Sequence, residues 1–305
     1  MKTLFIKLGL FSMICLAILT YILMNYGGNV DYFYEKFTTP KVKSMIIGDS
    51  RSFQGVQPSI INQYFHNSKK YGLPILNYSF TGSQAISGPL YTESILKKLD
   101  KKTTNGLFII SITPDFLTSK VGFRNDLGEF REANQPPHNM DIVDVNPNYE
   151  YLLKNIAYFH FKALFRKNSK THKDGWLEES NLPTDTLVFN TWRKHQIDLF
   201  LEDRNMYKIS DFRVNSFNVL IKELKKYGEV YLIRMPISKE FLTLENSYYP
   251  KLSTIVDSIA KINEIPFFNF NNSDKLQYKT YDGHHIDKYG GGKFTKALCD
   301  SITQK

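Results

Sequence analysis

Short apolar runs alternate with amphipathic stretches along most of the chain. Each apolar run is hydrophobic at nearly every position and ends at a turn, which is typical of strands buried on both faces. These runs cover residues 42–47, 75–80, 107–112, 230–235 and 267–270. Helical periodicity follows at residues 59–66, 90–99, 214–227, 252–262 and 294–302. The alternation predicts an α/β domain in which helices cover both faces of a mainly parallel, five-stranded sheet.

The stretch from about 115 to 205 departs from this rhythm. It carries prolines at 136, 137, 147 and 183 and many aromatic and charged residues. A helix is expected near residues 149–165. We expect the whole stretch to be an insertion between the third and fourth strands. Insertions of this length in compact domains usually serve a function or are flexible.

The N-terminal segment contains an uncharged apolar run from Leu8 to Tyr26. A helix over this run would be about 28 Å long, close to the hydrocarbon thickness of a bilayer. Lys2 and Lys7 precede it, so the positive-inside rule places the N-terminus in the cytoplasm. No convincing cleavage site follows, which favours an uncleaved signal anchor. A cleaved signal peptide and a buried helix of a soluble protein are the alternatives.

This interpretation divides the chain into four parts. They are a cytoplasmic N-terminus (1–7), a transmembrane signal anchor (8–26), a linker (27–40) and one α/β domain (41–305). An anchor or a cleaved signal would each place the α/β domain outside the cytoplasm, in the periplasm or at the cell surface.

Charge and cysteine content narrow the choice of partners. The chain has 39 lysines and arginines against 30 acidic residues, a net charge of +9. A net positive charge of this size suits binding to an anionic glycan or to a membrane surface. The alternative is that the lysines are scattered over the protein surface and bind no particular partner. No basic run exceeds two residues and no nucleic-acid module is recognisable, so no nucleic-acid partner is expected. Cys15 and Cys299 lie near opposite ends, which excludes a disulfide scaffold and a cysteine-ligated zinc site.

Two polar motifs carry candidate chemistry. Gly48-Asp49-Ser50 follows the first predicted strand, and sites in doubly wound sheets form where strands end. A second motif, with Asp282 and His285, follows the fifth strand. A serine nucleophile needs a histidine base and a carboxylate that orients the base. The sequence therefore predicts Ser50 as nucleophile, His285 as general base and Asp282 as orienting acid.

Each motif has a second interpretation. A serine after a strand often caps a helix without a catalytic role. The adjacent His284 and His285 could bind a metal ion, but no further ligands are obvious near them, so no metal is expected. No cofactor is expected either. The three-residue spacing from Asp282 selects His285 rather than His284 as the base.

These motifs resemble those of the SGNH (GDSL-type) hydrolase superfamily. The segment 77–83 is similar to that family's asparagine-to-glycine block, and the segment 282–290 resembles its Asp-x-x-His block. The resemblance covers roughly residues 41–300 without the insertion. It implies a three-layer αβα, flavodoxin-like fold, with the backbone amides of Ser50 and Gly82 forming an oxyanion hole.

The third block departs from the family pattern. The family usually has an asparagine after the third strand, whereas this chain reads Ser-Ile-Thr-Pro-Asp at 111–115. Loss of one oxyanion donor typically costs about 2.7–4 kcal/mol. A similar departure is familiar in membrane-anchored relatives that look like cell-envelope O-acyltransferases, including alginate O-acetylation proteins and the teichoic-acid D-alanylation protein. Those relatives work beside a multi-spanning membrane acyltransferase, which the resemblance implies as a partner.

A few other residues are candidates for substrate contact. Arg51 could meet a carboxylate or a glycan, or form a structural salt bridge, and Asn77 is a second candidate for substrate binding. Trp176 and Trp192 could stack on sugars, although packing is the better interpretation.

Taken together, the residues and the resemblance predict acyl transfer, namely O-acetylation of an extracytoplasmic polysaccharide through an acyl-Ser50 intermediate. The first alternative is a carbohydrate esterase of the same fold that removes the acyl group. The second is a non-catalytic protein of envelope assembly, which the missing asparagine favours and the intact serine, aspartate and histidine oppose.

Overall fold

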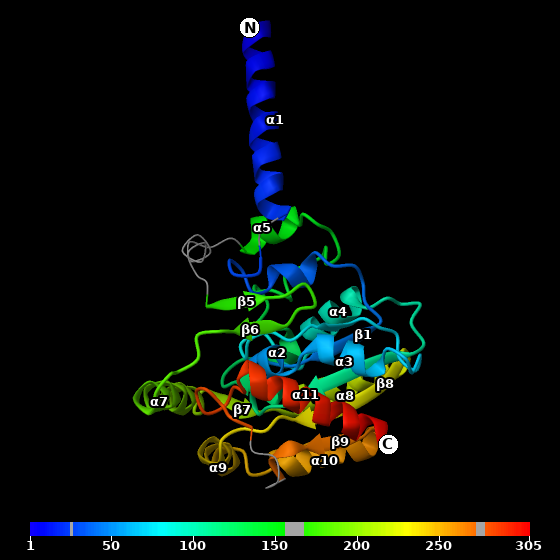
Figure 1. Cartoon of the computed structure of the whole chain (residues 1–305), viewed down its shortest axis with the longest axis vertical. Helices are drawn as coiled ribbons and strands as arrows, with labels where there is room; N and C mark the ends of the chain where they lie inside the picture. The colour runs from blue at the N-terminus through cyan, green and yellow to red at the C-terminus, as the bar shows by residue number, and fades with distance from the viewer. Residues whose placement is uncertain (25–26, 156–167, 273–277) are drawn as a thin grey trace.

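The computed structural model describes residues 1–24, 27–155, 168–272 and 278–305. A five-stranded sheet forms its centre (Figure 1). The strands are β1 (Ser44–Ile47), β2 (Ile75–Asn77), β3 (Gly106–Ser111), β8 (Gly228–Arg234) and β9 (Phe267–Asn269). They lie in the order β2-β1-β3-β8-β9, and every neighbouring pair is parallel. The predicted parallel sheet is confirmed, and its strand order is the flavodoxin-like one.

Helices cover both faces of this sheet. Successive side chains of a strand point to opposite faces, so Met45 and Ile47 join one core cluster and Ile46 joins the other. The first cluster packs against α4 (Pro89–Lys98), α8 (Asp211–Lys225) and α10 (Leu252–Asn263), and the second against α3 (Pro58–Phe65) and α11 (Lys288–Thr303). The predicted three-layer αβα arrangement is therefore confirmed.

The remaining elements connect or flank these layers. The helices are α2 (Ser50–Gly55), α5 (Tyr149–Asn155), α7 (Thr186–Asp203) and α9 (Lys239–Tyr248), with 3-10 turns at Tyr34–Phe37, Asp115–Leu117, Asn125–Leu127 and Phe270–Asn272. The short strands are β4 (Thr118–Lys120), β5 (Ser169–Thr171), β6 (Leu177–Glu179) and β7 (Tyr207–Ile209). The sequence pattern predicts neither α7 nor α9. In α7 the apolar residues do not form a continuous stripe along one face, so helical periodicity is not visible in its sequence.

Two predicted helices have different limits in the structure. The last helix, α11, begins at Lys288 rather than 294 although three glycines follow, because Asp287 caps it. The Asp287 carboxylate accepts hydrogen bonds from the backbone N–H groups of Tyr289 and Gly290, and such a cap is worth about 1 kcal/mol. The helix expected near 149–165 is present as α5 to Asn155, and its remainder lies outside the described residues.

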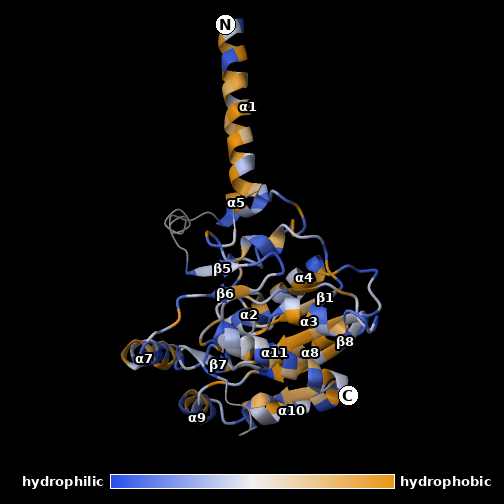
Figure 2. Ribbon diagram, viewed as in Figure 1, coloured by the Kyte–Doolittle hydropathy of each residue, from blue (hydrophilic) through white to orange (hydrophobic). Residues whose placement is uncertain are grey.

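The N-terminal helix α1 (Lys2–Met24) projects away from the rest of the molecule (Figure 1). It is long and apolar enough to cross a membrane, and Figure 2 shows hydrophobic residues over most of its length. Leu23 is its one buried residue. A helix this exposed is not the core helix of a soluble protein, so that alternative is excluded. A membrane anchor and a signal sequence both agree with the structure.

Residues 27–40, expected to be a linker, pack against the domain instead. Tyr34 and Phe37 are fully buried and belong to the core cluster that contains Met45. The buried Lys36 ammonium donates hydrogen bonds to the Asn77 carbonyl oxygen and to a carbonyl of the β5–β6 turn. Residues 27–40 thus lie against the domain, and their aromatic side chains cover apolar surface that the sheet and its helices leave open.

The stretch 115–205, predicted as an insertion, is attached to the domain near its two ends and through Glu132. The strands β4 and β7 pair antiparallel near its two ends. A buried ion pair adds a second connection, because Arg213 of α8 lies 2.7 Å from Glu132, with both side chains 1% exposed. Arg213 also donates a hydrogen bond to the Ser87 carbonyl oxygen.

We expect Arg213→Met to lower the free energy of unfolding by about 3–5 kcal/mol, because it leaves the buried Glu132 carboxylate without its partner. Urea denaturation of the detergent-solubilised chain measures the change. The matched control is Arg124→Met, whose partner Asp126 is 64% exposed, and its effect should stay below about 1 kcal/mol. Equal stabilities for the two variants would contradict a structural role for the buried pair.

Candidate active site

The candidate nucleophile, Ser50, is the first residue of α2 and follows β1 after a two-residue turn. The turn is crowded at Gly48, where a Cβ atom would lie 2.5 Å from Ser52 Oγ and 2.8 Å from the Cβ atom of Ser111. These distances exclude any side chain at position 48, so the position requires a glycine. The close approach places Ser50 at the carboxyl edge of the sheet.

Asp49 fixes the direction of this turn. Its Oδ1 accepts a hydrogen bond from the Arg51 N–H at 3.0 Å, and its Oδ2 accepts one from Thr113 Oγ1 at 2.6 Å. The first bond caps α2, and the second ties α2 to the segment that follows β3. Because the strand order reverses at β1, this edge is the switch point at which α/β sheets bind ligands.

A tight turn before α11 carries the candidate base and acid. The Tyr281 N–H donates to the His285 carbonyl at 3.0 Å, and Gly283 at the tip has a φ of +101°, which favours glycine. Asp282 Oδ1 accepts a hydrogen bond from the His285 N–H at 2.9 Å. The Ser238 N–H, just before α9, donates to the Gly283 carbonyl at 2.9 Å. These bonds hold the turn against the edge of the sheet.

Ser50, His285 and Asp282 form one hydrogen-bonded chain. His285 Nε2 lies 2.8 Å from Ser50 Oγ, and His285 Nδ1 lies 2.7 Å from Asp282 Oδ2. Asp282 and His285 are buried, whereas Ser50 is partly exposed. A nucleophile within reach of a base, and a base oriented by an acid, is the geometry of a serine triad. Sheet order and side-chain placement agree with what the resemblance to SGNH-type hydrolases implies.

Comparison with known proteins finds solved structures that match the chain at low sequence identity. No protein-family model and no curated protein sequence matches the chain. A carbohydrate acetylesterase from Sinorhizobium meliloti is 10% identical with a TM-score of 0.39, over 86% of this chain and 98% of that one. An aryl esterase from M. smegmatis is 11% identical with a TM-score of 0.36, over 86% and 98%. A lipase/acylhydrolase from Enterococcus faecalis is 11% identical with a TM-score of 0.37, over 87% and 95%. Similarity this low says nothing about activity.

The charges around the triad favour a neutral His284 and an ionised Asp282. Burial acts to raise the pKa of the Asp282 carboxyl, but the charge and hydrogen bonds of His285 outweigh it and hold that pKa well below its usual value. Burial, followed by the neighbouring His285, holds the pKa of His284 well below its usual value. His284 stacks on Phe241, with ring centroids 4.8 Å apart. It therefore acts as a packed neighbour of the base.

The metal interpretation is weaker than the triad interpretation. Ligand atoms of Asp282, His284 and His285 all lie within 4.8 Å of one another, so the three could hold an ion by distance alone. Both ring nitrogens of His285 already have partners, and His284 Nε2 lies 3.1 Å from Gln196 Oε1. A metal on His285 would displace Ser50 or Asp282.

A cavity of about 180 Å³ opens beside the triad. Ser50 and Gly82 both line it, and so does Asp115 from the end of β3. The structure thus brings the two predicted oxyanion donors to one cavity, and their role in holding an oxyanion stays a prediction. The other wall comes from α7 and α9, including Leu199, Phe200 and Phe241.

Arg51 forms a structural salt bridge, one of the two roles that the sequence left open for it. Its guanidinium pairs with Glu245 of α9 at 2.5 Å, and Glu245 also pairs with Arg234 at 3.1 Å. All three side chains are at most 7% exposed. Arg51 borders the cavity and shares the single buried carboxylate of Glu245 with Arg234.

Asn77 is not placed to bind a substrate, which corrects the prediction. Its side chain is fully buried. Its amide N–H₂ donates to the carbonyl oxygens of Ser52 and Val56 at 2.8 and 3.0 Å, and its Oδ1 accepts from the Ser79 N–H at 3.1 Å. Asn77 therefore joins the end of β2 to α2 and has no free group to offer.

Trp176 and Trp192 pack against other residues of the domain, which agrees with the packing interpretation rather than with stacking on sugars. Trp176 Nε1 donates to the Gln54 carbonyl oxygen at 2.7 Å. Trp192 meets Tyr281 edge-on, with ring centroids 6.2 Å apart. Tyr281 in turn stacks on the His285 ring, with centroids 5.7 Å apart, so α7 packs against the turn that carries Asp282 and His285.

Sequence reasoning does not single out Gln196, Glu245 or Asp115, which the structure places at the site. Nothing in the sequence near Gln196 or Glu245 reveals their long-range partners. Asp115 could have been found from the sequence, because it follows the third predicted strand by three positions, in the block where the SGNH pattern has its asparagine.

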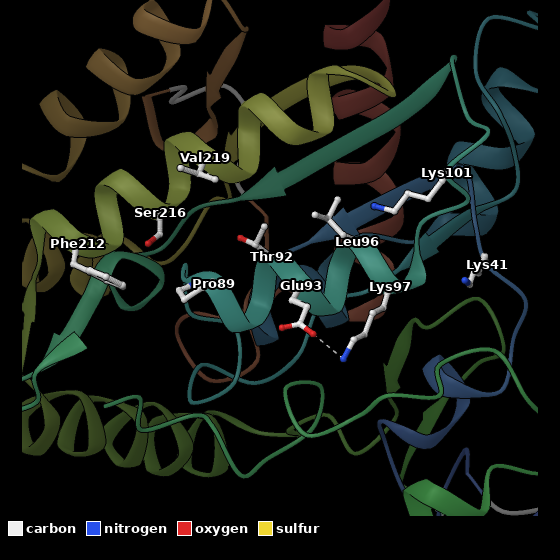
Figure 3. Close-up of a pocket in the computed structure, with 10 residues that line it drawn as sticks. All are labelled: Lys41, Pro89, Thr92, Glu93, Leu96, Lys97, Lys101, Phe212, Ser216 and Val219. Atoms are coloured by element: carbon white, nitrogen blue, oxygen red, sulfur yellow. Dashed lines mark ion pairs between the residues drawn. The ribbon is translucent and has the colours of Figure 1, made fainter. Parts of the chain in front are cut away.

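A larger cavity of about 720 Å³ lies between α4 and α8, lined by Leu96, Phe212 and Val219 among others (Figure 3). Glu93 and Lys97 form an ion pair at its rim, at 3.0 Å. It shares no lining residue with the cavity beside Ser50. It is therefore separate from the triad chemistry.

The low pKa of Asp282 predicts a pH dependence of stability. Asp282 binds a proton less readily in the folded state than in the unfolded state, so its ionised carboxylate stabilises the fold at pH values above its pKa in the unfolded chain. This contribution to the free energy of unfolding is lost as pH falls below about 4. Between about pH 4 and pH 2, wild-type stability should fall more steeply than that of Asp282→Asn, by up to about 1.4 kcal/mol per pH unit.

Urea denaturation across this pH range measures both slopes. The control is Asp257→Asn on the exposed side of α10, which should keep the wild-type slope. An Asp282→Asn variant with that same slope would show that the charge of Asp282 does not stabilise the folded state.

Proposed function

We propose that the chain is a serine acyltransferase that O-acetylates an extracytoplasmic polysaccharide through an acyl-Ser50 intermediate. The observation that carries the proposal is the contact of His285 with both Ser50 and Asp282, at 2.8 and 2.7 Å. This geometry supports serine-based acyl chemistry. The direction of transfer, the acceptor and the partner are the finer parts of the proposal.

The triad geometry supports two half-reactions. In the first, Ser50 Oγ adds to the carbonyl carbon of the acyl donor while its proton passes to His285 Nε2, and the leaving group takes that proton as it departs. In the second, an acceptor hydroxyl gives its proton to His285 and attacks the acyl carbon. Ser50 Oγ then leaves and regains the proton. Asp282 keeps the ring oriented in both steps.

The size of the cavity favours a short acyl group. At about 180 Å³ it is smaller than the cavities of about 300–1,000 Å³ that hold drug-sized ligands. Leu199, Phe200 and Phe241 give it an apolar wall. An acetyl group fits these limits, whereas a long fatty acyl chain does not.

The covering helix α7 favours transfer over hydrolysis. It comes from the stretch 115–205 and contributes Gln196, Leu199 and Phe200 to the lining of the cavity beside Ser50. Exclusion of water by a cover and a bound acceptor would lower the rate at which water attacks the acyl-enzyme. The apolar helix α1, acting as an anchor, would keep the domain near a membrane acyltransferase that supplies the acyl group.

Replacement of the nucleophile tests the proposal. Ser50→Ala should abolish the weak esterase activity of the purified chain on a small chromogenic ester, because the acyl-enzyme cannot form. In cells it should lower acylation of an envelope glycan, which release and quantification of ester-linked acetate measures. The matched control is Ser247→Ala on the exposed face of α9, which should leave both readouts unchanged.

The same variant separates the alternatives. A rise in glycan acylation in the Ser50→Ala strain would make the protein a deacylase and contradict transfer. No change in either readout would favour the non-catalytic alternative.

The proposed location has its own test. A reporter fused after Lys305 that works only outside the cytoplasm should be active, since Lys2 and Lys7 keep the N-terminus inside. Activity of a strictly cytoplasmic reporter would contradict this orientation. A mature protein beginning near residue 27 would show that the apolar run is a cleaved signal.

A further inference from the structure

The segment after β3 places a carboxyl group where the SGNH pattern has an amide. Asp115 lines the same cavity as Ser50 and Gly82. A Cβ atom on Gly82 would lie 3.6 Å from Asp115 Oδ2, so the carboxyl group is next to one predicted oxyanion donor. The ends of β1, β2 and β3 therefore converge on one cavity, each with one of these three residues.

The Asp115 carboxyl group has no hydrogen-bond partner among the residues that the structure describes. The contrast with nearby Asp49 is clear, since both Asp49 oxygens accept hydrogen bonds, from the Arg51 N–H and from Thr113. A partly buried polar group without a partner is costly unless a ligand completes it. Asp115 lines the cavity beside Ser50, so a ligand there could complete its hydrogen bonding.

The surrounding charges oppose ionisation of Asp115. Burial raises its pKa first, and the carboxylates of Asp49 and Glu245 add to the effect; Arg131 and Arg51 act in the other direction. The balance raises the pKa of Asp115 to about 6. The other titratable or charged groups lining the cavity are Arg204, Tyr249 and His284.

We propose that the carboxyl group of Asp115, in its protonated form, donates the third hydrogen bond to the oxyanion, in place of the family's asparagine. This inference rests on the proposed acyl chemistry. A protonated carboxyl group in an apolar site is a known type of oxyanion donor. When ionised it becomes an acceptor only, and its charge repels the oxyanion.

The proton of Asp115 is not transferred in this scheme. Ser50 Oγ forms a bond to the acyl carbon, its proton goes to His285, and the carbonyl electron pair moves to the oxygen that Asp115 and the two amides hold. Collapse of the intermediate returns the pair to the carbonyl and expels the leaving group. Asp115 acts on the same oxygen again in the second half-reaction.

The pH profile of kcat/KM on a small ester tests the role, with the full-length chain in detergent. In the wild type, activity should fall about tenfold per pH unit above pH 6, as Asp115 loses its proton. Asp115→Asn restores a donor that does not titrate, so its activity should persist through neutral pH. Asp115→Ala should lose about 10²–10³-fold at low pH. The exposed Asp126→Asn is the control and should keep the wild-type profile.

Binding of a boronic acid, which forms a tetrahedral anionic adduct on serine, gives a second readout that does not need turnover. Its affinity for the wild type should weaken above pH 6 relative to its affinity for Asp115→Asn. An Asp115→Asn variant that is folded but inactive at every pH, or that keeps the wild-type alkaline fall, would overturn the proposal. Activity that survives Ser50→Ala would instead overturn the proposed function itself.

Discussion

The β1–α2 turn has no room for a side chain at position 48, and the site depends on that crowding. With Gly48 pressed between Ser52 and Ser111, the backbone passes close enough to β3 for Asp49 to bond with Thr113. Ser50 then begins α2 at a fixed distance from the end of β3. Asn77 adds a third connection, from β2 to α2. The nucleophile is therefore held by three strands rather than by its own short helix.

His285, the proposed base, comes from the opposite end of the chain. Its position depends on α11, which packs against α2 and α3, and on a turn bonded to the start of α9. Ser50 and His285 are separated by 235 positions, so their contact is a product of the completed fold. The active geometry and global stability are thus coupled, and loss of packing in either α11 or the turn would separate base from nucleophile.

The sequence predicts the features that depend on local pattern. The five buried strands, their mainly parallel arrangement and the grouping of Ser50, Asp282 and His285 follow from apolar runs and from motifs at strand ends. It does not predict the features that depend on distant partners. Arg51 meets Glu245 across 194 positions, Asn77 turns inward to satisfy backbone carbonyls, and residues 27–40 fill a gap in the core. Each of these contacts forms only when distant segments meet in the folded chain, so no local sequence pattern predicts it.

The way in which α1 joins the domain limits how far the active site can travel. Leu23 is buried in the core, Thr20 contacts Tyr149, and residues 27–40 lie packed against the domain. If α1 is a membrane anchor, these contacts would keep the domain, and Ser50 with it, close to the bilayer. A short tether of this kind raises the local concentration of partners that share the membrane and excludes those beyond its span. In the proposed reaction, the search for an acyl donor would then be two-dimensional, and the acceptor would have to reach the membrane surface.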